Sequence, residues 1–223
     1  LLTTLSVWGF IPHNSWTFRA VEIGMQLDAT LLALALAYQL RVGQEERLRA
    51  ERLAQMDPLT GLNNRRAFYD KTRALWSHAI RHGHPTSVML LDIDLFKQVN
   101  DAYGHAHGDD VLKATADILR QSIRLGDILA RWGGEEFIVF LPETGRDEAT
   151  MLAERLRTTI AGMRVPYEAG VSAVTASFGI AQRTPSQLTL DALIACADDC
   201  LYESKQQGRN RVTTCPSEPA PVS

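Results

Sequence analysis

The chain has 223 residues, of which 45% are hydrophobic and 22% charged, and its formal net charge is -3 at pH 7. This length suits one domain of about 150 residues with an appendage, and the two fractions exclude a wholly disordered chain. An isoelectric point near 6.1 argues against a nucleic-acid binder that relies on broad positive charge, so we expect no nucleic-acid partner. A phosphate-bearing substrate stays compatible with this charge if a metal ion offsets the repulsion. Three clustered cysteines (Cys196, Cys200 and Cys215) are too few for a disulfide framework.

Residues 1–40 are poor in charge and contain only Arg19, Glu22 and Asp28 as charged residues. As a helix, residues 21–40 would be about 30 Å long, which is enough to cross a bilayer. The two acids are costly in hydrocarbon, so a buried helix of a soluble protein is the alternative. The chain begins without methionine, and we expect it to be a fragment of a longer protein. We interpret residues 1–40 as a partial transmembrane region.

An excess of arginine follows this region directly, and by the positive-inside rule it predicts that the rest of the chain is cytoplasmic. These residues are Arg41, Arg47, Arg49 and Arg52. Residues 41–57 are rich in charge and contain no proline, which predicts a helical linker or stalk. Pro58 follows, and because the residue before a proline avoids the helical conformation, the stalk is predicted to end at Asp57. The proline-rich residues 216–223 predict a disordered tail.

Between these ends, hydrophobic periodicity alternates between helix and strand spacing. Helices are predicted from Asn64 to about Ile80, at Asp110–Ile123, at Asp147–Met163 and at Asp191–Gln207. Strands are predicted at Ser87–Ile93, Ile128–Trp132, Phe137–Leu141, Val174–Ala181 and Arg211–Thr214. The pattern predicts one α/β domain over residues 58–215.

Two acidic clusters fall where predicted strands end. Asp92 and Asp94 close the strand Ser87–Ile93, and strand alternation places both on one face. Glu135 and Glu136 follow Gly133-Gly134 in a predicted hairpin, where glycines provide positive φ and let a ligand approach the backbone. Carboxylates on two adjacent turns suit Mg²⁺ that bridges a protein to substrate phosphates. A pair of solvated acidic turns is the alternative for either cluster alone.

The segment from Phe96 to Asp110 gathers Lys, Asn, Asp and His around two glycines. Asn and Asp can together recognise guanine, because a carboxylate accepts hydrogen bonds from guanine N1–H and the exocyclic amine. A transition-metal site at His105 and His107 is the competing interpretation, although no third ligand has suitable spacing. His107 could also be a solvated loop residue.

These residues resemble those of the GGDEF diguanylate cyclases, in the form with Glu for Asp. The naming motif is Gly133-Gly134-Glu135-Glu136-Phe137. Similar motifs run in order through residues 57–212: Asp57-Pro58-Leu59-Thr60-Gly61-Leu62-Asn63, Asp92-x-Asp94-x-Phe96-Lys97-x-x-Asn100-Asp101, Gly104-His105-x-x-Gly108-Asp109, Ser177-x-Gly179-x-Ala181, Ala197-Asp198 and Lys205-x-x-Gly208-Arg209-Asn210.

The resemblance implies a fold and an activity. The fold would be an α/β sandwich with a central, mostly antiparallel sheet flanked by helices, similar to the nucleotide-cyclase and polymerase palm arrangement. The activity would be the Mg²⁺-dependent condensation of two GTP into cyclic di-GMP with release of two pyrophosphates, with Mn²⁺ as the alternative ion. A catalytically silent module that binds GTP or cyclic di-GMP as a receptor is the competing function.

The resemblance also implies roles for individual residues. Metal ligands would be Asp92, the Ile93 carbonyl and Glu135, with Glu136 as a further acid beside the metal. Glu135 would accept the proton of the attacking 3′-hydroxyl, and Lys97 would stabilise phosphate charge. Substrate contacts would come from Asn100 and Asp109 to guanine, from His105 to the nucleotide, and from Lys205 and Arg209 to the terminal phosphates.

Regulation and assembly are implied in the same way. Arg124-x-x-Asp127, five residues before the glycine pair, resembles an inhibitory product site to which Arg155 would contribute; a surface salt bridge is the alternative. One domain would hold one GTP, so we expect a homodimer controlled by the stalk. The N-terminal region resembles the end of a multi-helix membrane sensor, which implies a bacterial inner-membrane protein with a cytoplasmic catalytic domain.

Overall fold

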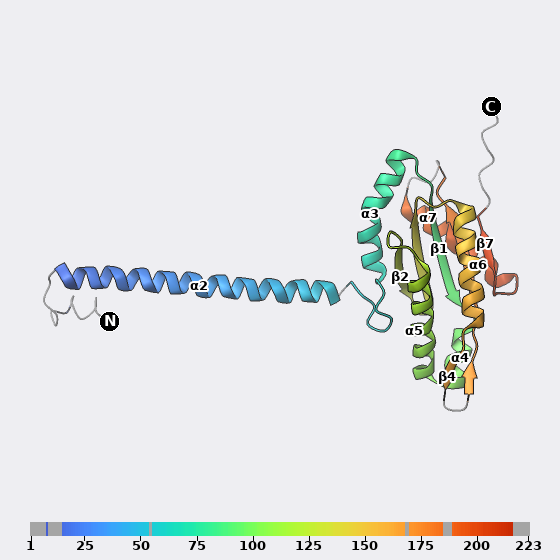
Figure 1. Cartoon of the computed structure of the whole chain (residues 1–223), viewed down its shortest axis with the longest axis horizontal. Coiled ribbons are helices and arrows are strands. Elements are labelled where there is room, and N and C mark those ends of the chain that lie inside the picture. Colours follow the sequence, from blue (N-terminus) through green and yellow to red (C-terminus); the bar gives the residue numbers. More distant parts are fainter. Residues whose placement is uncertain (1–7, 9–14, 54, 168–169, 185–188, 216–223) are drawn as a thin grey trace. The chain divides into compact units, whose positions relative to one another are not determined.

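The computed structural model describes Trp8 and residues 15–53, 55–167, 170–184 and 189–215 (Figure 1). The chain divides into two compact units, Leu1–Leu53 and Ala54–Ser223, which are described separately. The expected disordered tail at 216–223 falls wholly outside the described residues.

Among its described residues, the first unit forms the helix α2 (Ser15–Leu53), of 39 residues. Its segment Glu22–Gln44 is long and apolar enough to cross a membrane, with a mean hydropathy of 1.3, and none of it is buried. The expected stalk is continuous with this apolar helix, but the helix ends at Leu53 and not at Asp57 as predicted. No proline interrupts residues 15–53, and Gly24 and Gly43 each cost a helix only about 1 kcal/mol.

The second unit is built on a five-stranded sheet in the order β2-β3-β1-β6-β7. The strands are β1 (Thr86–Ile93), β2 (Ile128–Gly133), β3 (Glu136–Pro142), β6 (Ala176–Gln182) and β7 (Val212–Thr214). Neighbouring strands are antiparallel except β6 and β7, which are parallel. The expected central, mostly antiparallel sheet is confirmed.

Helices cover both faces of this sheet (Figure 1). They are α3 (Arg65–His82), α4 (Phe96–Tyr103), α5 (His105–Ser122), α6 (Arg146–Gly162) and α7 (Leu190–Gln206). Alternation along β1 divides the core, since Met89 and Leu91 pack in the cluster that includes α5 and α6 residues. Val88 and Leu90 pack in the other cluster, with residues of α3 and α7. All eight residues of β1 are buried, as expected for a central strand.

The structure corrects the sequence prediction between the first strand and the second predicted helix. Residues 96–103 form α4, and α5 begins at His105 rather than at Asp110. Phe96 and Val99 bury one face of α4, and Gly104 at φ 84 separates the two helices. This short amphipathic helix was not predicted, because most residues of the segment are polar. A small second sheet of β4 (Val165–Tyr167) and β5 (Gly170–Ser172) was also not predicted.

The cysteines are free and pack near α7. Cys200 is buried, and Cys196 is half-buried against the core formed with α3 and α7, so both act as small core residues. The Cys215 Sγ lies 2.6 Å from the Cys200 Sγ.

Candidate active site

Asp92 lies near the end of β1 and faces α7. It has the same strand parity as Val88 and Leu90, whose side chains pack in the core shared with α7. The last turn of α7 carries Lys205, whose Nζ lies 2.8 Å from Oδ2 of Asp92. Asp92 is only 7% exposed, so this carboxylate is nearly buried, whereas Lys205 is half-buried.

The hairpin between β2 and β3 brings two further carboxylates to the same place. Glu136 is the register partner of Asp92 across β1 and β3, and the Ile93 N–H donates to the Glu135 carbonyl at 3.4 Å. Of the two hairpin glycines, only Gly134 has positive φ, at 50°. A Cβ at either glycine would meet no atom within 4 Å, so this side of the turn is open to a ligand.

Burial dominates the electrostatics of this end of the sheet. It raises the pKa of Asp92 to about 6, with Lys205 opposing the shift and Glu135 and Glu136 adding to it. Burial also raises the pKa of Glu136, and there Lys205 again lowers it while Asp198 raises it. Crowded, desolvated carboxylates of this kind favour either a proton or a cation.

The donor set fits a hard divalent cation. Three carboxylates from two adjacent strand ends offer oxygen atoms, which Mg²⁺ prefers to nitrogen or sulfur. Ile93 follows Asp92 at the strand end, so its carbonyl belongs to the same stretch of backbone. The residues expected to hold a metal are thus brought together by the register of β1 and β3.

Asp94, the other acid of the first cluster, is held in protein hydrogen bonds. It accepts from Thr175 Oγ1 and Ser177 Oγ, each at 2.6 Å, and from the Asn210 N–H at 3.0 Å. Asp94 therefore positions the loop after α7.

That loop carries Arg209 and has unusual backbone geometry. Gly208, Arg209 and Asn210 have φ values of 111°, 62° and 46°, so two residues other than glycine adopt left-handed conformations. The bond from Asn210 to Asp94 and a bond from Arg157 Nη1 to Asn210 Oδ1 (2.9 Å) hold this conformation. Arg209 is exposed there, four residues after Lys205.

The residues expected to bind the nucleotide lie on α4 and α5. Lys97 is exposed, Asn100 is half-buried on α4, and His105 and Asp109 are exposed on α5. A Cβ at Gly108 would lie 1.9 Å from Oδ1 of Asn100. Because residue 108 is glycine, the Asn100 side chain can lie directly against it, next to Asp109 in the sequence.

The alternative metal site at His105 and His107 is wrong. His107 is buried, and its Nε2 lies 2.6 Å from Ser172 Oγ, whereas His105 is exposed. Residues two apart on a helix do not share a face. His107 is a packed residue of α5, and the expectation of a solvated loop residue is likewise wrong.

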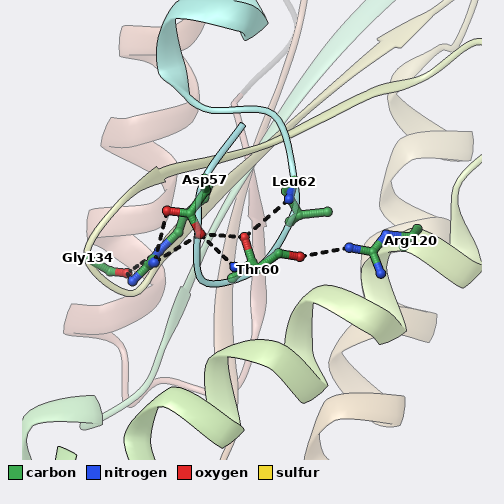
Figure 2. Close-up of polar contacts among 6 residues, drawn as sticks. Asp57, Thr60, Leu62, Arg120 and Gly134 are labelled. Atoms are coloured by element: carbon green, nitrogen blue, oxygen red, sulfur yellow. Dashed lines mark hydrogen bonds and ion pairs between the residues drawn. The ribbon is translucent and has the colours of Figure 1, made fainter. Parts of the chain in front are cut away.

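A hydrogen-bond network around Asp57 and Arg131 stabilises the hairpin between β2 and β3 (Figure 2). The sequence did not predict this network as a whole. Asp57 accepts from Thr60 Oγ1 at 2.7 Å and from Arg131 Nη1 at 3.1 Å. Arg131 also donates from Nε and Nη2 to the Gly134 carbonyl, at 2.9 and 2.7 Å. The Asp57-x-x-Thr60 spacing, typical of a side-chain-capped turn, was the signal for half of this network. The pairing with Arg131 spans 74 residues and could not be inferred from spacing.

The three residues expected at a product site lie around one pocket of about 500 Å³. Its walls include Arg124 and Asp127 from the loop before β2, and Arg155 from α6. The Arg124 N–H donates to Asp127 Oδ2 at 2.9 Å, so this carboxylate shapes the loop that presents the Arg124 side chain. Burial raises the pKa of Asp127. Glu148 also lines the pocket, so the charge there is mixed.

Comparisons with known proteins agree with this geometry. Diguanylate cyclase DgcM of Escherichia coli K12 is 42% identical over 168 residues, which are 75% of this chain and 40% of that protein. The crystal structure of the coiled coil and GGDEF domain of DgcB from Caulobacter crescentus, in complex with c-di-GMP, aligns with a TM-score of 0.76 at 32% identity. That alignment covers 84% of this chain and 98% of that one.

A second solved structure has the same hairpin variant. The active GGEEF domain of a diguanylate cyclase from Vibrio cholerae aligns with a TM-score of 0.66 at 32% identity and covers 70% of this chain and 98% of that one. This chain spans well under half the length of the curated relatives it matches first. The family model described as "Diguanylate cyclase, GGDEF domain" matches residues 54–211, and the chain therefore belongs to the GGDEF family.

Proposed function

We propose that this chain is a diguanylate cyclase, which condenses two GTP into cyclic di-GMP and releases two pyrophosphates. The observation that carries the proposal is the pairing of Asp92 with Glu136 across β1 and β3, with the Lys205 Nζ 2.8 Å from Asp92. Carboxylates for a metal and cations for phosphates are what phosphoryl transfer requires, because it depends on positioning and charge neutralisation. The names of the relatives support the same activity.

Mg²⁺, or Mn²⁺ in its place, would be held by Asp92, Glu135 and the Ile93 carbonyl, with Glu136 beside it. Bound there, the ion would neutralise developing phosphate charge and acidify a hydroxyl near it. Glu135 would accept the proton of the 3′-hydroxyl, and Lys97 would lie along the phosphates. Lys205 and Arg209 would bind the terminal phosphates from the end of α7.

Guanine would be recognised between α4 and α5. Asn100 and Asp109 offer the amide and carboxylate groups that distinguish guanine from adenine, and His105 is exposed at the start of the same helix as Asp109. The close approach of Asn100 to Gly108 supports this assignment, because it holds the amide in place before a nucleotide binds.

Two such domains would have to meet for the reaction, since each supplies one GTP and the two 3′-hydroxyls attack reciprocally. We therefore propose a homodimer. The last third of α2, residues 41–53, continues as helix from the apolar segment and would be the element that pairs.

A membrane location at the bacterial inner membrane is proposed from α2. Its apolar side chains are exposed over Glu22–Gln44. Arg41 lies near the end of this segment, and three further arginines follow the segment within the same helix. Exposed apolar surface of this extent needs a covering phase or partner. The arginines favour a cytoplasmic position for residues 58–215.

The activity is tested by incubating the whole chain, in detergent or vesicles, with GTP and Mg²⁺ and detecting cyclic di-GMP by mass spectrometry. We expect product that disappears with EDTA, and a rate per chain that rises with protein concentration as dimers form. Binding of GTP or cyclic di-GMP without turnover under these conditions would instead establish the silent receptor.

Product inhibition is proposed at the pocket lined by Arg124, Asp127 and Arg155. Arginine forms paired, charge-assisted hydrogen bonds with phosphodiesters. Arg124→Ala should therefore raise the cyclic di-GMP concentration needed for half-inhibition by roughly tenfold or more, with the uninhibited rate kept. Arg73→Ala, which removes an exposed arginine on α3, serves as the matched control. Equal inhibition of both variants would remove the pocket from the proposal.

A further inference from the structure

A cluster of imidazoles lies at the C-terminal end of α3. Three of the six histidines fall within seven residues, at His78, His82 and His84. The ring centroids of His78 and His82 are 4.4 Å apart, and those of His78 and His84 are 5.3 Å apart. Glu143, which follows β3, completes the group with its Oε1 3.2 Å from His84 Nδ1.

The backbone holds these residues together from separate elements. Gly83 ends α3 in the left-handed conformation at φ 67, and the His84 N–H donates to the Ala79 carbonyl at 3.1 Å. The His84 carbonyl accepts from Arg183 Nη2 at 3.3 Å. Glu143 has φ 50, and the next residue, Thr144, donates its N–H to the Pro85 carbonyl at 3.2 Å. The cluster is therefore set by tertiary contacts on both sides.

One nitrogen of the cluster is buried without a hydrogen bond. The His84 Nδ1 is closed to solvent and, within the described residues, has no partner of acceptable hydrogen-bond geometry, although Glu143 Oε1 is near. One ligand atom from each of His78, His84 and Glu143 lies within 4.8 Å of the other two. Ligand atoms around tetrahedral Zn²⁺ are about 3.3 Å apart, from bonds of about 2.0–2.1 Å, so small side-chain rotations would complete the geometry.

We propose that His78, His84 and Glu143 form a binding site for a divalent transition metal of the Zn²⁺ class. Imidazole nitrogen with one carboxylate selects Zn²⁺, Ni²⁺ or Cu²⁺ over Mg²⁺ and Ca²⁺. The C-terminal end of α3 adds a favourable negative potential for a cation. His82 packs on the His78 ring and supports its orientation.

This site is separate from the candidate active site. It lies where Thr86 pairs with Pro142, whereas Asp92 pairs with Glu136 at the other end of the same two strands. Six residues of strand place the two sites about 20 Å apart. A metal bound there would link the end of α3 to the connection between β3 and α6. Because only the folded chain brings the three ligands together, the metal would also stabilise the folded domain by mass action.

The test titrates tag-free whole chain with Zn²⁺ in excess Mg²⁺, which keeps the carboxylate site occupied. We expect one Zn²⁺ per chain, and a Co²⁺ adduct with the strong visible absorption of tetrahedral coordination. His84→Ala and Glu143→Ala should each weaken Zn²⁺ binding by at least roughly tenfold, as expected for loss of a ligand. His105→Ala, which removes an exposed histidine on α5, should leave the affinity unchanged.

X-ray absorption of the Zn²⁺-loaded unmodified chain gives a readout that needs no variant. It should count two or more imidazoles around the ion. Unchanged Zn²⁺ affinity in both ligand variants, or a Zn²⁺ shell without imidazole, would overturn the proposal and leave the cluster as stacked surface histidines.

Discussion

Asp92→Asn is expected to abolish formation of cyclic di-GMP and, in the same protein, to raise the metal-free stability at neutral pH. The loss of activity follows from removing a charged ligand from the proposed metal site. The gain in stability follows from burial, which raises the pKa of Asp92 from its ordinary value of 3.8 to about 6. Burial outweighs the ion pair with Lys205, so the charged carboxylate destabilises the folded state.

The sign of the pH dependence follows from proton binding. With the higher pKa in the folded state, the folded chain binds the proton more tightly between about pH 4 and pH 6. The stability of the unmodified protein should fall as pH rises through this window, and the full penalty, on the order of 2 kcal/mol, is present above pH 6. The asparagine variant lacks this penalty. The difference between the two proteins should grow from about pH 4 to pH 6 and then level off.

Urea unfolding in EDTA across this pH range measures the difference, and the GTP assay measures activity. Asp70→Asn changes an exposed acid of α3 and should alter neither quantity. Retained turnover in Asp92→Asn would contradict the metal assignment. A variant less stable than the unmodified chain at pH 7 would show that the Lys205 pair outweighs burial.

Gly179→Ala is expected to destabilise the domain by about 3 kcal/mol or more, at the upper end of overpacking effects. The added Cβ would lie 2.1 Å from the Ala197 carbonyl oxygen and 2.3 Å from the Leu201 nitrogen. Both atoms are backbone of α7 and cannot rotate away, so the helix must shift from β6. Because α7 also carries Lys205, surviving protein should bind GTP weakly.

Thermal unfolding followed by circular dichroism measures this effect. Gly162→Ala is the matched control, because Gly162 ends α6 and a Cβ there meets no atom within 4 Å. The control should be neutral or slightly stabilising, since alanine is the better helix former. Equal unfolding temperatures for the two variants would show that α7 accommodates the methyl group at no cost.

Much of the fold could be predicted from the sequence, because hydrophobic periodicity is a local property. The strand over residues 87–93 appears as a continuous apolar run, and α3, α6 and α7 lie within one or two residues of their predicted limits. The short helix α4 was missed because only Phe96 and Val99 show its buried face. The pairing of β4 with β5 was missed because three-residue strands carry almost no periodic signal.

The acids and cations of the candidate site were also visible in the sequence, since their motifs are local and ordered along the chain. The residues that these side chains contact could not be predicted from the sequence. The ion pair of Asp92 with Lys205 spans 113 residues along the chain, and Arg131 reaches Asp57 across 74. Alternation placed Asp92 and Asp94 on one face, but only the folded chain shows that Asp94 is held by Thr175, Ser177 and Asn210.

Length, mean composition and charge indicated one folded domain with an appendage, whereas their distribution along the chain separated an apolar N-terminal helix from a polar α/β domain. The sequence by itself determined most of the longer elements and the residue types of the site, because both depend on neighbours in the chain. Only the tertiary structure decided which acids face α7, which are buried, and that His78, His84 and Glu143 meet. These properties depend on strand register and helix packing between residues far apart in sequence, which no local pattern encodes.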